Sequence, residues 1–177
     1  AALPVPFDAQ TTQFALDFIS GRLRGLLLER GYRYDVVDAV LKAQAANPAK
    51  AERFARSLGA WTAREDWNII LPAYSRCARI TRDLKGVYPV DETALVEGEE
   101  RRLLASVRAA QTRLDNNADL NAALEAVRAM VPEINAFFDK VLVMAEDETL
   151  RKSRLGLLQA IVALVRPLAD LSALEGF

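Results

Sequence analysis

The stretch FFDKVLVMAEDETLRKSRLGLL, residues 137–158, decides the fold that the sequence predicts. It begins with the end of an apolar helix, crosses a short acidic connection and enters a last helix. Asp147 is a suitable N-cap for that helix, and Glu148 falls in the first turn, where the helix dipole favours negative charge. Apolar residues then recur at helical spacing: Leu150, Leu155, Leu157, Leu158, Ile161 and Leu164. The stretch therefore predicts a helical hairpin whose second helix buries one face.

The same stretch resembles the C-terminal signature of the DALR-type anticodon-binding domain, in the form that ends the β subunit of bacterial glycyl-tRNA synthetase. The family's Phe-Phe-Asp-Lys-Val and Met-Ala-Glu-Asp runs are present within 137–147, and its Arg-Leu-x-Leu-Leu run is present at 154–158. A terminal stretch like the family's follows at 169–174. The hairpin is thus identified as the end of such a domain.

A second segment, FISGRLRGLLLERGYRYDVVDAVL at residues 18–41, is similar to the same family. The likeness is looser between the two segments. Within residues 72–85, Tyr74 and Ser75 stand where the family has Asn and Lys, whereas Arg76 and Ile80 match. The resemblance covers about residues 14–174.

Length and composition predict one all-α helical bundle of about six to eight helices without a sheet. A chain of 177 residues is long enough for one domain with a sizeable core. Half of its residues are hydrophobic, and no stretch alternates with strand period for long. We expect a single domain over 1–177, with an extended lead-in at 1–10 because of Pro4 and Pro6. The sequence has no initiating Met, so we expect a C-terminal fragment of a longer chain.

The helices are expected at about 11–30, 36–46, 48–58, 62–84, 93–114, 119–140 and from 148 onward. Gly59 is expected to end the third of these, and Asp35 to cap the second. Residues 115–117 separate the fifth from the sixth. Prolines inside two helices, Pro72 and Pro132, are expected to bend or split them.

Gly21 and Gly25 lie four residues apart in the first predicted helix. Each glycine costs a helix interior about 1 kcal/mol relative to alanine. The pair therefore predicts a close helix contact or a kink at this place.

The residue types present exclude several kinds of site. The chain has no histidine, which removes triads and histidine-based metal sites. Its one cysteine, Cys77, cannot form an internal disulfide, which favours a reducing compartment. No apolar run reaches the length of a membrane span, so we expect a cytoplasmic protein with no membrane partner. We also expect no metal, no cofactor and no catalytic residue in this chain.

Charge is unevenly distributed, although the net charge is only −1. Residues 50–88 carry a net charge of +4, and residues 91–148 carry −7. Basic residues recur every third position at Arg76, Arg79 and Arg82, with Lys85 just beyond, and we name these four the basic stripe. Such a stripe can follow RNA phosphates. The alternative is a solvated helix face whose charges are paired with neighbouring acids.

Four further residues are candidates for reading RNA bases. Arg33 and Tyr74 could offer a cation and a ring, and Trp61 and Trp67 flank an arginine. Unpaired RNA bases are commonly held by aromatic or guanidinium planes. Aromatic residues beside helix ends are more often part of the core, and we expect that role for at least one tryptophan.

The resemblance implies that the domain grips the anticodon arm of glycine tRNAs and senses the cytosines that glycine anticodons share. It also implies that a separate α subunit activates glycine with ATP. Two alternatives remain open at this stage. One is the related terminal domain of an arginyl-tRNA synthetase, and the other is a helical module that binds a protein through its acidic half without binding RNA.

Overall fold

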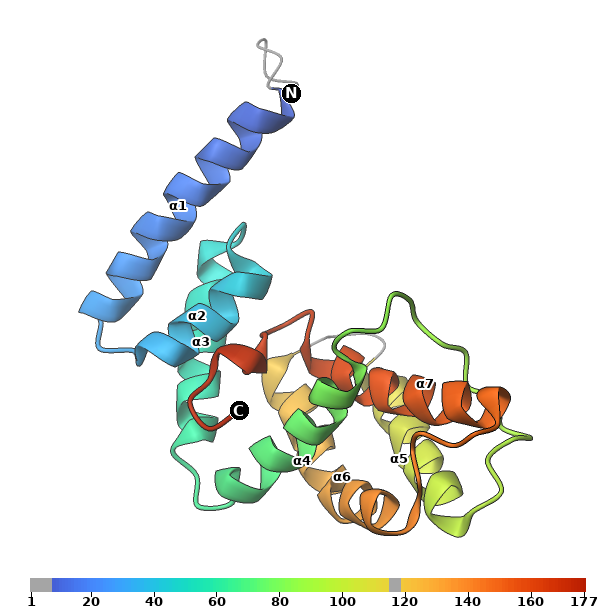
Figure 1. Ribbon diagram of the computed structural model, residues 1–177. Coiled ribbons are helices and arrows are strands. Elements are labelled where there is room, and N and C mark those ends of the chain that lie inside the picture. The colour runs from blue at the N-terminus through green and yellow to red at the C-terminus, as the bar shows by residue number, and fades with distance from the viewer. Residues whose placement is uncertain (1–7, 115–118) are drawn as a thin grey trace.

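The computed structural model describes residues 8–114 and 119–177 and shows an all-helical molecule (Figure 1). Its helices are α1 Ala9–Glu29, α2 Tyr34–Gln44, α3 Pro48–Thr62, α4 Trp67–Thr81, α5 Gly98–Leu114, α6 Leu120–Lys140, α7 Glu148–Val165 and the short 3-10 helix η1 Leu171–Ala173. These residues contain no strand. The predicted all-α class is therefore confirmed, and the seven α-helices found there fall within the predicted range.

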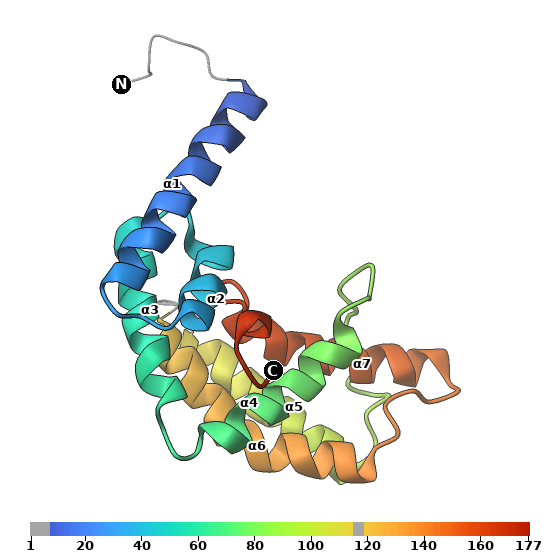
Figure 2. The same ribbon diagram turned by 60° about the vertical axis from the view of Figure 1, so that its left-hand side comes forward.

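Four helices, α4 to α7, form the body of the molecule, and α2 and α3 pack at one end of it (Figure 1). Helix α1 projects away from the rest and meets α2 only near its own C-terminal end, as the turned view also shows (Figure 2). The chain after α7 continues toward α2 and places η1 against that helix. None of the described helices is long and apolar enough to cross a membrane.

The predicted hairpin of α6 and α7 is confirmed. Helix α6 ends at Lys140 and α7 begins at Glu148. The Asp147 carboxylate accepts a hydrogen bond from the backbone N of Leu150 at 2.8 Å, as expected of an N-cap. The following apolar stripe enters the core, with these side chains buried: Leu155, Leu157, Leu158, Ile161 and Val165.

The Arg-Leu-x-Leu-Leu run has a packing role. The Arg154 guanidinium pairs with the Glu100 carboxylate of α5 at 2.5 Å, and both side chains are buried. Arg154 also donates to the Leu142 carbonyl at 2.8 Å, and Glu100 accepts from the backbone N of Glu97. Arg154 thus ties α7 to the start of α5 and to the connection after α6.

Close packing requires glycine at position 156. A Cβ atom added there would lie 2.5 Å from the backbone oxygen of Tyr88. The segment before α5 therefore lies directly on the surface of α7, and any side chain at this position would push it away.

The C-terminal segment binds the N-terminal helices through backbone groups. The backbone N of Asp170 donates to the Ala39 carbonyl at 2.8 Å, and that of Glu175 donates to the Asp35 carboxylate at 3.1 Å. Gln44 donates to the Pro167 carbonyl at 2.7 Å. These bonds hold α2 against the end of the chain.

The predicted cap at Asp35 is wrong, because α2 begins one residue earlier, at Tyr34, with Arg33 as its N-cap. Asp35 is buried in the first turn. It accepts from the backbone N atoms of Val36 and Glu175, so its role is to dock the C-terminal segment.

Several predicted boundaries are also wrong. Helix α3 continues through Gly59 to Thr62, because Trp61 in its last turn is buried in the core. Helix α4 begins at Trp67 rather than near 62. Helix α5 begins at Gly98 rather than at 93, because Asp91 accepts hydrogen bonds from Thr93 and forms a turn there.

Neither internal proline splits its helix. Helix α4 continues across Pro72, and α6 continues across Pro132. Both prolines lie on the exposed side, and buried residues before and after them hold each helix together.

The expected contact at Gly21 and Gly25 is not formed within the described residues, since an added Cβ would meet nothing within 4 Å at either position. Residues 9 and 10 of the expected lead-in belong to α1, which Asp8 caps through the backbone N of Thr11. The rest of the lead-in, residues 1–7, and the separation expected at 115–117 lie outside the described residues.

Candidate nucleic-acid interface

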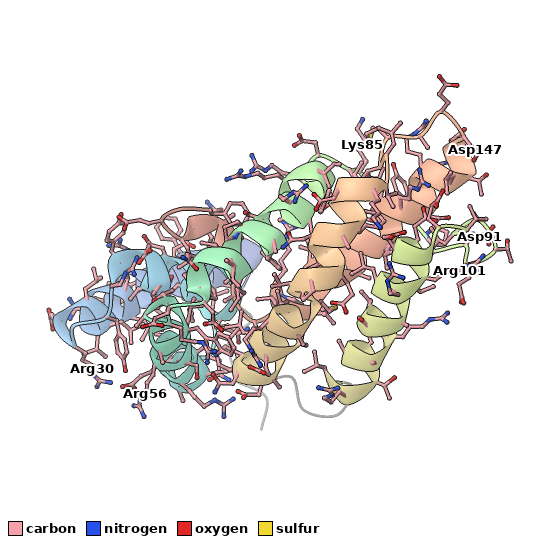
Figure 3. All side chains as sticks on the ribbon, turned by 90° about the horizontal axis from the view of Figure 1, so that it is seen from below. Arg30, Arg56, Lys85, Asp91, Arg101 and Asp147 are labelled. Carbon is pink, nitrogen blue, oxygen red and sulfur yellow. The ribbon has the colours of Figure 1, made fainter. Side chains whose placement is uncertain are left out.

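The basic stripe lies on the outer face of α4. The inner face of this helix is apolar and buried, with Ile70, Leu71, Ala73, Tyr74 and Cys77 in the core. Arg76 and Arg79 are exposed on the other side, Arg82 is exposed at the C-cap, and Lys85 is exposed in the turn that follows. Figure 3 shows Lys85 well separated from Arg30 and Arg56, on the side of the molecule that also carries Asp147. The sequence thus places four cations along one edge.

The basic stripe has no ion pair. Within the described residues, no carboxylate oxygen lies within 4.0 Å of its charged nitrogens. By contrast, Arg24 makes a two-bond pair with Asp38 at 2.6 and 3.0 Å. The alternative of a stripe neutralised by neighbouring acids therefore does not describe this surface.

Two arginines of the stripe rest on aromatic rings. The Arg76 guanidinium lies 4.2 Å from the centroid of the Phe138 ring, and that of Arg79 lies 5.6 Å from the centroid of the Phe177 ring. Such contacts orient a cation without neutralising it. Both guanidiniums therefore keep donors that can reach an anion.

Helix α7 extends the basic surface. Arg166 is exposed at the C-cap of α7 and, with Arg82 and Lys85, lines a cavity of about 320 Å³, which we name the Lys85 groove. Gln159 lines the same groove and donates to the Gly86 carbonyl at 2.8 Å, which holds the turn after α4. Arg166 was not predicted, because only the packing of α4 against α7 brings it beside the stripe.

A second cavity, of about 340 Å³, adjoins this groove, and we name it the α4–α7 cavity. Its lining consists of Tyr74, Ala78, Arg82, Val162, Arg166, Asp170, Ser172 and Phe177. Arg82, Val162 and Arg166 line both cavities, so the two are neighbours on one face.

The pKa values of two titratable groups in the α4–α7 cavity, Tyr74 and Asp170, differ from their ordinary values. Burial raises the pKa of Tyr74, whose hydroxyl donates to the Val162 carbonyl at 3.4 Å. Burial of Asp170 opposes its ionisation, but hydrogen bonds from Ser172 and the charges of Lys42 and Arg166 lower its pKa overall. At neutral pH the cavity therefore holds an ionised carboxylate beside two guanidiniums.

Cys77 is no candidate nucleophile. Its side chain is fully buried in the core, and burial raises the pKa of its thiol to about 12. The described residues contain no group of three or more His, Cys, Asp or Glu side chains that could hold a metal ion.

The four predicted base readers are either buried or ion-paired in the described structure. Trp61 and Trp67 are only 7% and 8% exposed, and the indole N of Trp61 donates to Asn121 at 3.1 Å. Arg33 pairs with Asp35 at 2.7 Å and with Glu175 at 3.5 Å. Among the four, only Tyr74 lines the α4–α7 cavity, and there it is almost fully buried. A role in RNA binding stays a prediction for all four residues, and the burial of both tryptophans gives it no support.

Known proteins resemble almost the whole chain. The β subunit of glycine–tRNA ligase from Moorella thermoacetica is 40% identical over 173 residues, which cover 96% of this chain and 25% of that protein. The β subunit from Anaeromyxobacter sp. strain K is 34% identical over 94% of this chain and 24% of its own. The chloroplastic/mitochondrial glycine–tRNA ligase 2 of Arabidopsis thaliana is 34% identical over 98% of this chain and 16% of its own. The chain thus spans a quarter or less of these relatives.

A family model described as the DALR anticodon binding domain matches residues 70–171. This range contains the basic stripe, the Lys85 groove and most of the lining of the α4–α7 cavity. It covers more than half of the chain and runs from the start of α4 into η1. The chain therefore belongs to the DALR anticodon-binding domain family.

Proposed function

We propose that this chain is the tRNA-binding part of a glycine–tRNA ligase β subunit, and that it grips the anticodon arm through the basic stripe. The observation that carries the proposal is the absence, within the described residues, of any carboxylate partner for these four exposed cations. Phosphates would supply the missing counter-charge. The similarity to the β subunits named above supports the choice of tRNA among nucleic acids.

The rest of the relatives' length has no counterpart in this chain, so we place catalysis elsewhere. These relatives are named β subunits, which implies a partner subunit, and we propose that an α subunit activates glycine with ATP. In this account the chain contributes tRNA affinity to a cytoplasmic ligase and needs no cofactor of its own. Glycine isoacceptors are the proposed tRNAs.

The test is a triple variant, R76A/R79A/R82A, measured against glycine tRNA by fluorescence anisotropy over a salt series. Each lost phosphate contact should lower the slope of log affinity against log salt by about 0.7 to 0.9. We therefore expect weaker binding at low salt and a slope reduced by about 2 to 3.

A matched control removes the same charge elsewhere. The variant R56A/R102A/R108A neutralises three exposed arginines that already pair with Glu52, Glu99 and Glu92. It should retain most of the affinity and slope of the unsubstituted chain. Equal losses of tRNA affinity in the two variants would show a nonspecific charge effect. Unchanged tRNA binding by R76A/R79A/R82A would refute the proposed surface.

A further inference from the structure

Helix α1 carries an apolar face that the described part of the chain leaves open to solvent. Phe14 and Phe18 are 74% and 70% exposed, and Gly21 and Gly25 follow them along the helix. Each of these residues lies three or four positions after the one before, so the four share one side of α1. We name Phe14, Phe18, Gly21 and Gly25 the α1 face.

The α1 face lies opposite the side of the helix that packs on the rest of the chain. Leu23 and Leu27 are buried on that packed side, and each lies two positions from Gly25. Two positions correspond to roughly half a turn of a helix. Because α1 also projects from the body of the molecule in both views (Figure 1 and Figure 2), its two faces have different surroundings.

A hollow of about 560 Å³ lies beside the α1 face. Its lining includes Phe18, Ile19, Gly21, Gly25 and Leu26 of α1, and Pro48 at the start of α3. An added Cβ atom at either glycine would meet nothing within 4 Å. Glycine allows another backbone to approach a helix closely. The face therefore combines two large apolar side chains with a depression that another element can enter.

The chemistry of the α1 face suits protein rather than RNA. None of its four residues is charged, so it offers no cation to a phosphate. Ile19 and Leu26, at its edge, are 45% and 43% exposed and extend the apolar surface. Contiguous exposed apolar residues are typical of surfaces that another protein segment covers.

A contact between two copies of this chain through the α1 face would be small. Between Phe14 and Leu26 the helix is about 20 Å long, and with its side chains it is about 10 Å wide. Two copies joined there would bury on the order of a few hundred Å² each, whereas stable interfaces bury about 800 Å² per partner. A segment of the same polypeptide needs less area, because the linkage gives it an effective concentration in the millimolar range.

The relatives contain enough polypeptide to supply such a segment. The chain spans 25% of the Moorella thermoacetica β subunit and 24% of the Anaeromyxobacter β subunit. About three quarters of each relative therefore lies outside the part that matches this chain.

We propose that the α1 face docks against an apolar surface of the remaining part of the β-subunit polypeptide. Phe14 and Phe18 enter that surface, and its backbone approaches Gly21 and Gly25. This inference rests on the proposed function, because it takes the chain to be one part of such a subunit. Docking fixes the direction of α1 and so positions the tRNA-binding part relative to the rest of the subunit.

The test compares the chain alone with the β subunit that contains it. Ile19→Cys places a thiol beside the α1 face, and its reaction with a maleimide is followed by peptide mass spectrometry. Cys77 gives no background, because it is fully buried and burial raises the pKa of its thiol to about 12. In the β subunit the Ile19→Cys thiol should react at least about tenfold more slowly than in the chain alone, because it reacts only when the docked face opens.

Two double variants test whether the phenylalanines hold the contact. F14S/F18S, added to Ile19→Cys, should restore fast labelling in the β subunit and leave the rate in the chain alone unchanged. L142S/M144S is the matched control, because Leu142 and Met144 are 71% and 58% exposed outside α1, and it should keep the labelling slow. Circular dichroism of the chain alone checks that each variant folds.

The outcomes separate this inference from the proposed function. Equally fast labelling of Ile19→Cys in both forms, or slow labelling that F14S/F18S does not relieve, would overturn the docking. Labelling of the chain alone that slows as its concentration rises would place a second copy on the α1 face and overturn the choice of occupant. None of these measurements involves tRNA, so failure of the proposed function is seen separately, as unchanged tRNA binding by R76A/R79A/R82A.

Discussion

At the scale of single residues, the Arg154–Glu100 pair is the clearest test of the fold. Both side chains are nearly inaccessible, at 6% and 0% exposure, so the loss of one leaves an uncompensated buried charge. We expect Arg154→Ala to lower the free energy of unfolding by about 3 to 5 kcal/mol in urea denaturation. Arg128→Ala breaks an exposed pair with Glu125 and should change the free energy of unfolding very little. Equal effects of the two substitutions would contradict the structural role given to Arg154.

Two glycines provide a second residue-scale test. Gly156→Ala brings a Cβ against the backbone of Tyr88 and should destabilise the chain by about 1 to 3 kcal/mol, the usual cost of overpacking. Gly59→Ala, inside α3 three residues before its end and with open space around it, should stabilise by about 0.5 to 1 kcal/mol. Thermal unfolding of both variants checks the pair, and a stabilising Gly156→Ala would show that the two segments are not in contact.

The sequence predicted residue roles well only where they depend on near neighbours. The cap at Asp147 is set by the next three residues and is confirmed. The partner of Arg154 lies 54 positions earlier and that of Asp35 lies 140 positions later, so neither role could be read from spacing. The same reason explains why Arg166 was missed.

At the scale of elements, attachment of the C-terminal segment to α2 should depend on pH. The lowered pKa of Asp170 means that its ionised form is favoured in the folded state. Its stabilising contribution is therefore present above its ordinary value of 3.8 and is lost as the pH falls through its lower folded value. Between about pH 6 and about pH 3, the free energy of unfolding should fall less steeply for D170N than for the unsubstituted chain. Parallel curves would contradict this role.

Helix α1 should be tolerant of change on its exposed face. Phe14 and Phe18 are 74% and 70% exposed, whereas Leu27 is buried against the rest of the chain. F14S/F18S should leave the melting temperature almost unchanged, and Leu27→Ala should cost about 2 to 5 kcal/mol. If F14S/F18S lowered stability as much as Leu27→Ala does, the exposed face of α1 would have to be packed against other elements. Helical spacing predicted the helix, but it did not distinguish apolar residues that other elements cover from those they leave open.

At the scale of the whole molecule, the resemblance and the apolar periodicity were sufficient to predict an all-α bundle with a C-terminal hairpin. The basic stripe was predicted as a linear feature, and the structure adds that it borders two neighbouring cavities. These cavities could not be predicted, because they form only where α4, α7 and the C-terminal segment meet. The basic residues of the stripe therefore come to border these two cavities only when the chain is folded.

The most direct test of the central claim is the affinity of this chain for glycine tRNA across a salt series, beside the same tRNA with its anticodon cytosines replaced. We expect affinity to fall as salt rises and each replaced base to weaken binding by about 1 to 3 kcal/mol, the scale of specific base contacts. No binding at low salt, or binding that salt does not weaken, would contradict the claim that the basic stripe holds the phosphates of tRNA.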